Sequence, residues 1–226
     1  MNDLPVKDLG LIHYSEAYKI QNEIFNTSLD KKKNKEEVFG TILVCEHHHV
    51  YTIGKSGDKK NLLINEQKLK DINAEYFHVD RGGDITYHGP GQIVVYPIID
   101  LDKYKLGVKD YIYLLEFMII DILNDYGIKG EISKGNIGVW IDAGKPNERK
   151  ICSAGVKTSR GITMHGLALN VNTDLSYFDY INPCGFTEKG ITSVKNELSR
   201  EINIDDLKKM ITDELLIRLR DISRKA

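Results

Sequence analysis

The 226-residue sequence lacks long apolar runs and paired cysteines. No window approaches the roughly 18 uninterrupted apolar residues of a membrane-spanning helix. The N-terminus, Met1 to Pro5, has neither a basic start nor an apolar segment, so we expect no signal peptide. The three cysteines, Cys45, Cys152 and Cys184, show no CxxC spacing. The sequence therefore predicts a cytoplasmic protein without a membrane span, in which any of the three cysteines is free to react as a thiol.

An excess of charge of one sign is also missing. Lys and Arg total 31 and Asp and Glu total 33, so the net charge is −2. This balance gives no support to a nucleic-acid-binding surface spread over the whole protein, and we expect no nucleic-acid partner. The length favours a single domain with one core, residues 1–226, with a C-terminal helix at about 205–222 packed on it.

Hydrophobic periodicity predicts strands interrupted by a few helices. Apolar residues at helical spacing indicate helices at 16–25, 107–126 and 205–222, the first of them capped by Ser15, and a weaker helix at 61–73. We predict strands at residues 11–14, 40–45, 50–54, 76–79, 93–101, 130–133, 136–141, 150–157 and 161–172. The lysines at 31–33 are expected in a solvated loop. Because the strands and helices do not alternate regularly, we expect an α+β fold with a mixed, largely antiparallel sheet and flanking helices.

Special residues concentrate in one stretch, from Arg81 to Gln92. It holds four glycines, a proline, an arginine and a histidine within twelve positions. Glycine permits positive φ and close approach of other atoms, so this stretch predicts backbone that contacts a ligand, although a turn-rich connector would also explain it. It fits neither GxxxxGKS/T nor GxGxxG, so a P-loop or Rossmann nucleotide site is not expected.

One of the three cysteines stands out as a candidate nucleophile. Cys184 lies between Pro183 and Gly185 with no apolar periodicity across it, which indicates a reachable thiol, whereas Cys45 and Cys152 lie inside strand-like runs and are expected to pack. A free thiol has a pKa of about 8.5, so a catalytic cysteine needs a nearby base or cation. Candidate partners are His88, His165 and the basic residues of segment 149–160.

The consecutive histidines at 47–49 suggest a metal site at first sight. Neighbours along a strand point to opposite faces, and no second His or Cys pair lies at ligand spacing. We therefore predict no metal site.

Several motifs in one order resemble those of the lipoyl(octanoyl) transferases, in the biotin/lipoate protein ligase superfamily. The first is the stretch from Arg81 to Gln92, RGGDITYHGPGQ, with Tyr-Pro after it at 96–97. The others are GVW at 138–140, KICSAG at 150–155, HGLALNVN at 165–172 and NPCG at 182–185. The resemblance covers roughly residues 10–200. Histidines stand at 48 and 49 where the family usually has prolines, which leaves the proposed catalytic groups unchanged.

The resemblance implies a biotin/lipoate protein ligase-like catalytic domain and a set of site residues. The family's nucleophile falls on Cys184 and its essential lysine on Lys150, with His165 as a possible support. The lysine would lower the thiol pKa, shuttle protons, or both. The implied substrate-binding residues are Arg81, Gly82, Gly83, Asp84, Ile85, Thr86, Tyr87, His88, Ser153, Ala154, Gly155, Gly166, Leu167 and Ala168.

The implied activity is an acyl transfer that begins endogenous protein lipoylation. Octanoyl (or lipoyl) would pass from the phosphopantetheine arm of acyl carrier protein to Cys184 as a thioester. It would then pass to a lysine of apo lipoyl domains, such as those of 2-oxoacid dehydrogenase E2 subunits and the glycine cleavage H protein. The thioester is already activated, so no cofactor and no ATP are expected.

Three alternatives remain at this stage. An ATP-dependent lipoate-protein ligase would share the fold and would not need the cysteine. An amidotransferase would move lipoyl or octanoyl groups between carrier domains through its own cysteine. A non-catalytic module that binds carrier domains would need neither Cys184 nor Lys150.

Overall fold

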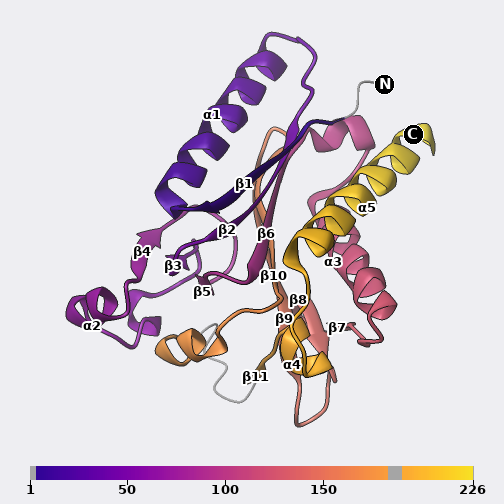
Figure 1. Cartoon of the computed structure of the whole chain (residues 1–226). Helices are drawn as coiled ribbons and strands as arrows, with labels where there is room; N and C mark the ends of the chain where they lie inside the picture. The colour runs from indigo at the N-terminus through magenta and orange to yellow at the C-terminus, as the bar shows by residue number, and fades with distance from the viewer. Residues whose placement is uncertain (1–3, 183–189, 226) are drawn as a thin grey trace.

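A computed structural model of the chain describes residues 4–182 and 190–225, and these form an eight-stranded sheet with helices on both faces (Figure 1). The strand order is β1-β2-β6-β10-β9-β8-β7, and β11 pairs with β9. The strands are β1 (Val6–Ile12), β2 (Thr41–His47), β6 (Gln92–Ile98), β7 (Glu131–Ser133), β8 (Asn136–Ile141), β9 (Arg149–Ser159), β10 (Ile162–Asn170) and β11 (Gly190–Ile191). Only β1–β2 and β9–β11 pair in parallel among these described strands. The predicted α+β class with a largely antiparallel sheet is confirmed.

A second, three-stranded sheet lies below α1 in Figure 1. Its order is β4 (Glu75–His78), β3 (Val50–Ile53) and β5 (Ile85–His88), with β3 parallel to β4 and antiparallel to β5. The strand β5 comes from the middle of the glycine-rich stretch, for which the sequence predicted ligand-contacting backbone or a turn-rich connector. Its four residues have no glycine and include β-branched and aromatic side chains, which favour a strand.

The helix α1 (Tyr14–Lys33) packs on one face of the large sheet, against β6 and β10. It starts and ends beyond the predicted bounds, and His13, not Ser15, is at its N-cap position. The prediction of a solvated lysine loop at 31–33 was wrong, because these residues form the last turn of α1. Lys32 there donates hydrogen bonds to Asp100 (2.5 Å) and Asp102 (2.6 Å).

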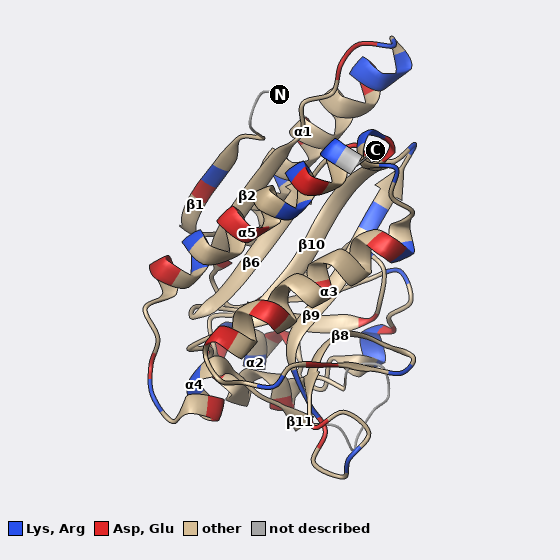
Figure 2. Ribbon diagram, turned by 90° about the vertical axis from the view of Figure 1, so that its right-hand side faces the viewer, with Lys and Arg blue, Asp and Glu red and all other residues tan. Residues whose placement is uncertain are grey.

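The opposite face of the large sheet is covered by α3 (Val108–Asp125) and α5 (Ile204–Lys225), which pack against each other (Figure 1). Both were predicted from their apolar spacing to within a few residues. Figure 2 shows acidic and basic residues interspersed on α5, whereas the charged residues of α3 are mainly acidic. None of the described helices is long and apolar enough to cross a membrane. The short helical elements are η1 (Lys59–Asn61), α2 (Glu66–Asp71), η2 (Leu101–Tyr104), η3 (Leu175–Tyr180) and α4 (Val194–Leu198).

Strand alternation assigns the buried side chains of the large sheet to two cores. Val95 of β6 and Leu167 of β10 belong to the core under α3 and α5. Their neighbours Val94 and Ala168 belong to the core under α1. Because successive residues of a strand point to opposite faces, the two faces can be assigned residue by residue, and this assignment locates the site below.

Candidate active site

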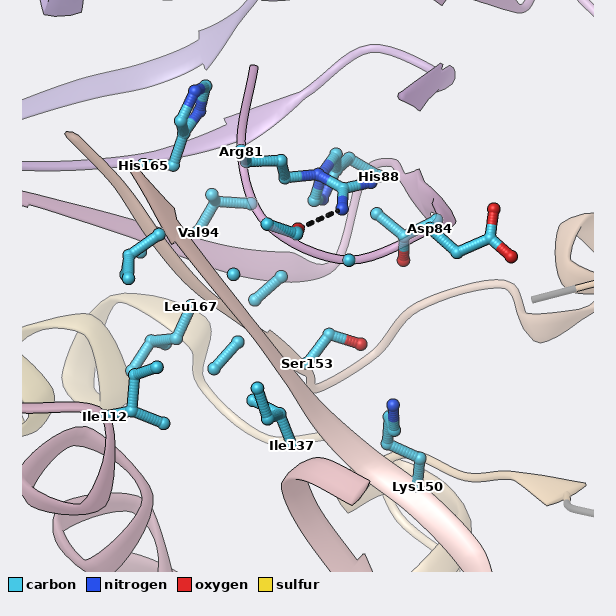
Figure 3. A pocket seen from close by; sticks show the side chains of 18 of the residues that line it. Arg81, Asp84, His88, Val94, Ile112, Ile137, Lys150, Ser153, His165 and Leu167 are labelled. Carbon is cyan, nitrogen blue, oxygen red and sulfur yellow. Dashed lines mark hydrogen bonds between the residues drawn. The ribbon is translucent and has the colours of Figure 1, made fainter. Parts of the chain in front are cut away.

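The glycine-rich stretch lies over β9 and β10 and encloses with them a cavity of about 420 Å³ (Figure 3). The cavity is lined by every site residue that the sequence predicted within the described part of the chain, apart from Tyr87. The glycine-rich stretch, Ser153 to Gly155 and Gly166 to Ala168 are therefore brought together from three distant segments, with Lys150 and His165 beside them. Cys184 lies outside the described residues.

Tyr87 faces away from the cavity. It lies between Thr86 and His88 on β5 and is fully buried in the core of the small sheet. Its hydroxyl hydrogen-bonds to Nδ1 of His49 (2.7 Å), and its ring stacks on Tyr177 with centroids 5.0 Å apart. The structure thus makes Tyr87 a packing residue, in contrast to its neighbours.

The side chains that line the cavity belong to both faces of the large sheet. Ser153 and Gly155 of β9 share the α1 face with Ala168, whereas Ala154 and Leu167 pack toward α3. The glycine-rich stretch covers the α1 face, because a Cβ added at Gly155 would lie 3.0 Å from the carbonyl oxygen of Gly82. The part of the cavity beneath this stretch is therefore bounded by the α1 face of β9 and β10, where small residues leave room.

A break in the alternation of β9 brings Lys150 to this same face. Ile151 and Cys152 are adjacent, yet both pack in the core under α3 and α5, and the register with β8 shifts at this point. This β-bulge lets Lys150 share a face with Ser153, three positions away, as Figure 3 shows. The ammonium nitrogen of Lys150 lies 4.5 Å from the centroid of the Trp140 ring.

The carboxylate of Glu116, a residue that the sequence did not single out, supports this region from α3. Its Oε1 accepts a hydrogen bond from the backbone N–H of Gly138 (2.6 Å). Burial raises the Glu116 pKa, while the Gly138 N–H and the charge of Lys150 oppose the rise. Gly138 has a φ of +114°, and a Cβ there would lie 2.4 Å from the carbonyl oxygen of Cys152. A side chain at position 138 would therefore disturb the β8–β9 pairing beside Lys150.

Arg81 holds the start of the glycine-rich stretch in place. Its Nη2 donates hydrogen bonds to the carbonyl (2.7 Å) and the hydroxyl oxygen (3.0 Å) of Thr52, and its Nη1 donates to the carbonyl of Gly82 (3.0 Å). The backbone N–H of Gly82 donates to the carbonyl of Val156 (3.0 Å). The stretch is thus attached both to the small sheet and to β9.

His88 is a neutral imidazole at the end of the stretch. Gln92 donates its two amide hydrogens to Asn170 Oδ1 (2.8 Å) and to the carbonyl of Tyr87 (3.2 Å), so its Oε1 must be the acceptor opposite His88. The Nδ1–H of His88 donates to that oxygen (2.7 Å), which leaves Nε2 without a proton. Burial, with a smaller contribution from the neighbouring His47, lowers the pKa of His88 to about 3.

His165 reaches the α1 side through an unusual backbone. Its φ of +61° turns the side chain so that the ring stacks on Tyr18, with centroids 6.0 Å apart. Its Nε2–H donates to Asp80 Oδ1 (3.1 Å), and Asp80 Oδ2 accepts from Lys157 (2.5 Å). These two donors hold the Asp80 pKa well below its usual range, whereas burial lowers the pKa of His165. His165 therefore fixes the residue that precedes Arg81.

His47, Cys45 and Cys152 are structural residues. His47 donates from Nδ1 to the carbonyl of Ile12 (3.1 Å) and accepts at Nε2 from the Tyr96 hydroxyl (2.7 Å), and burial lowers its pKa to about 4. Residues 4–182 and 190–225 contain no group of three or more His, Cys, Asp or Glu that could hold a metal ion. Cys45 and Cys152 are buried and their pKa values are raised by burial, which confirms them as packing residues.

Several cavity residues gave no signal in the sequence. They are apolar or aromatic side chains from helices and strands, which period and composition cannot distinguish from ordinary core residues. They include Tyr14, Val94, Ile112, Ile137 and Phe178. The cavity is consequently more apolar than the glycine-rich stretch alone suggested.

Comparison with known proteins gives one consistent family. A family model described as the lipoyl protein ligase A/B catalytic domain matches residues 13–216. A protein of Bacteroides thetaiotaomicron named octanoyltransferase is 51% identical over 209 residues, which make up 92% of this chain and 92% of that protein.

Solved structures share the fold at low sequence identity. The bipartite lipoate protein ligase of Thermoplasma acidophilum matches with a TM-score of 0.71 at 13% identity, over 99% of this chain and 91% of that chain. A biotin protein ligase from Aquifex aeolicus, solved with biotin and ATP, matches with a TM-score of 0.52 at 12% identity, over 98% and 71% of the two chains. The expected biotin/lipoate protein ligase-like fold is confirmed.

Proposed function

Because the chain belongs to the lipoyl protein ligase A/B catalytic domain family, we propose that it is an acyltransferase that delivers octanoyl groups to lipoyl domains. The observation that carries the proposal is 51% identity to an octanoyltransferase over 92% of both chains. The cavity agrees with this activity, since the glycine-rich stretch, the small residues Ser153 and Ala168 and several apolar side chains border a space of about 420 Å³.

The proposed reaction has two transfers at one thiol. The Cys184 thiolate attacks the carbonyl carbon of an octanoyl thioester on the phosphopantetheine arm of acyl carrier protein. A new thioester forms, and the arm leaves as a thiolate that takes up a proton. A lysine amine of an apo lipoyl domain, from a 2-oxoacid dehydrogenase E2 subunit or a glycine cleavage H protein, then attacks the acyl-enzyme. The amide forms, the amine loses its proton, and Cys184 leaves as the thiolate. Because one thioester replaces another in the first transfer, no ATP is required.

Lys150 has two roles in this proposal. Its ammonium lowers the pKa of the nucleophilic thiol, and its amine carries the proton that the second transfer releases. The β-bulge of β9 and the contact with Trp140 support this assignment, since together they hold the lysine on the face of Ser153. A free catalytic thiol requires a reducing compartment, so we also propose a cytoplasmic location.

Intact-mass measurement tests the first transfer. The protein is incubated with octanoyl-acyl carrier protein in the absence of ATP. We expect an octanoyl adduct that hydroxylamine removes and that is missing in Cys184→Ser. The matched control is Cys152→Ser, which changes a buried thiol of the core and is expected to keep the adduct. A wild-type protein without an adduct would reject the thioester mechanism.

Two further arms separate the alternatives. Apo lipoyl domain is added to the acyl-enzyme, and the adduct should move to the lipoyl domain. Free octanoate with ATP is offered in parallel, and transfer only under that condition would favour a ligase. An octanoylated carrier domain replaces acyl carrier protein as donor, and transfer from this donor alone would favour an amidotransferase.

A further inference from the structure

Side-chain size changes in one direction across the α1 face of the sheet beneath the glycine-rich stretch. Ser153 of β9 pairs with Ala168 of β10, and Ala168 pairs with Val94 of β6. All three line the cavity. Neighbouring strands lie about 4.8 Å apart, so this row extends roughly 10 Å across the sheet. The row passes from two small side chains to the branched side chain of Val94.

The next row in the same direction has the same order of sizes. Gly155 pairs with Gly166, and neither has a side chain. Tyr96, two residues beyond Val94 on β6 and on the same face, lines the cavity with its ring. The cavity therefore has room above Ser153 and Ala168 and is narrowed at Val94, whereas the backbone of Gly82 covers Gly155.

The narrow end is held rigidly. Tyr96 is buried, and its hydroxyl donates to His47 Nε2 at 2.7 Å. Tyr14, the first residue of α1, is also buried and packs its ring edge-on against His47, with centroids 5.3 Å apart. Val94 lies on β6, opposite Ala168 of β10 and two residues from Tyr96. It has two methyl groups facing the cavity side of the sheet and no polar anchor.

We propose that Val94 sets the upper limit on the length of the acyl chain that this site accepts. This inference rests on the proposed function and adds the residue that selects the substrate. An acyl chain whose carbonyl lies near Lys150 runs over Ser153 and Ala168, and its methyl end meets the Val94 side chain. Removing the two methyl groups extends the channel, whereas a larger side chain shortens it.

The expected size of the effect follows from the energetics of apolar pockets. One additional methylene in a hydrophobic pocket changes kcat/KM by about 10- to 200-fold. Val94→Ala should therefore raise kcat/KM for decanoyl relative to octanoyl by about 10-fold or more. Val94→Phe should lower kcat/KM for octanoyl relative to kcat/KM for hexanoyl by a similar factor.

Val95 provides the matched control. It is the next residue on the same strand and is completely buried, but it packs in the core under α3 and α5 and does not line the cavity. Val95→Ala removes the same atoms and destabilises the fold in a similar way, because both changes leave a cavity in a packed core. We expect it to keep the wild-type order of chain lengths.

The experiment measures transfer from hexanoyl-, octanoyl-, decanoyl- and dodecanoyl-acyl carrier protein to an apo lipoyl domain. The wild type, Val94→Ala, Val94→Phe and Val95→Ala are compared by the ratios of kcat/KM, which do not depend on the fraction of folded enzyme. The proposal is overturned if Val94→Ala transfers octanoyl with wild-type ratios for the longer chains, or if Val95→Ala changes the ratios equally.

A second readout separates failure of this proposal from failure of the proposed function. Free fatty acids of 6 to 12 carbons are added to each variant, and the rise in Tm is recorded for each length. If the wild type transfers from none of the donors, the proposed function fails, and the length limit is judged by binding alone. If the fatty acid that raises Tm most is longer for Val94→Ala than for the wild type, the assignment of Val94 is supported. If it has the same length in both, the assignment is rejected.

Discussion

Lowering the pH from 7 to 5 should destabilise this protein because it buries two histidines in their neutral form. His47 and His88 have pKa values lowered from 6.5 to about 4 and about 3, in both cases mainly by burial. In the unfolded chain both imidazoles take up a proton as the pH falls through about 6.5. The unfolded state therefore binds more protons than the folded state, and the stability present above pH 6.5 is lost as the pH falls.

The magnitude follows from the unfolded pKa, because both folded values lie below 5. At pH 5 the unfolded imidazole is 1.5 pH units below its pKa, which corresponds to about 2 kcal/mol for each histidine at 1.36 kcal/mol per unit. The two together give a loss of about 4 kcal/mol. The lowered pKa values of His49 and His165 act in the same direction. Asp80 does not contribute in this range, because its unfolded pKa of about 3.9 and its lower folded pKa both lie below 5.

Urea titrations at pH 7 and pH 5 measure this loss as the difference in the free energy of unfolding. His47→Gln removes one of the titrating groups but keeps an amide that can donate and accept. Its packing cost is the same at both pH values and cancels in the difference. We expect the variant to lose about 2 kcal/mol less than the wild type between the two pH values. Equal stability of the wild type at pH 7 and 5, or an equal loss in the variant, would refute the reasoning.

Three further predictions concern the residues that hold the site together. Thr52→Val removes the hydroxyl that Arg81 contacts and should lower the free energy of unfolding, measured by urea titration, by about 2 kcal/mol. Thr52→Ser keeps a hydroxyl and should lose less than half of that, so equal losses in the two variants would contradict the role of the hydroxyl. Gly138→Ala should lower Tm far more than Gly135→Ala, because both glycines have positive φ but only the first would place a Cβ against a carbonyl oxygen of β9; similar Tm values would count against this. Lys150→Arg should still form the thioester adduct but lose turnover by about 100-fold, because guanidinium does not release its proton; wild-type turnover at every pH would exclude a proton shuttle.

The fold could be predicted from the sequence wherever a local pattern decided the structure. The apolar spacing of α3 and α5 gave both helices to within a few residues, and the β-prone runs gave most strands of the large sheet. The last turn of α1 was missed because three consecutive lysines, taken alone, indicate a solvent-exposed loop. In the structure Lys32 is held by Asp100 and Asp102, which come from a distant part of the chain.

The candidate site was predicted as a set of segments, and their orientation was not. The motifs identified the residues that meet around the cavity, but Tyr87 was included because motif membership says nothing about which face of a strand a residue occupies. The contacts of Glu116 with Gly138 and of His165 with Asp80 depend on tertiary structure and on a positive φ at His165. No local pattern in the sequence predicts either contact.

The β-bulge of β9 changes how the spacing between Lys150 and Ser153 should be interpreted when sequences are compared. In a regular strand, residues share a face only when an even number of positions separates them, and these two are separated by three. If one residue between them is deleted and the bulge is lost as well, the spacing becomes even in a regular strand, and the two residues still share a face. If one residue is inserted or deleted and the bulge remains, Lys150 points into the core instead. Alignments of this segment should therefore be judged by the parity of the spacing together with the bulge, and not by the presence of a lysine alone.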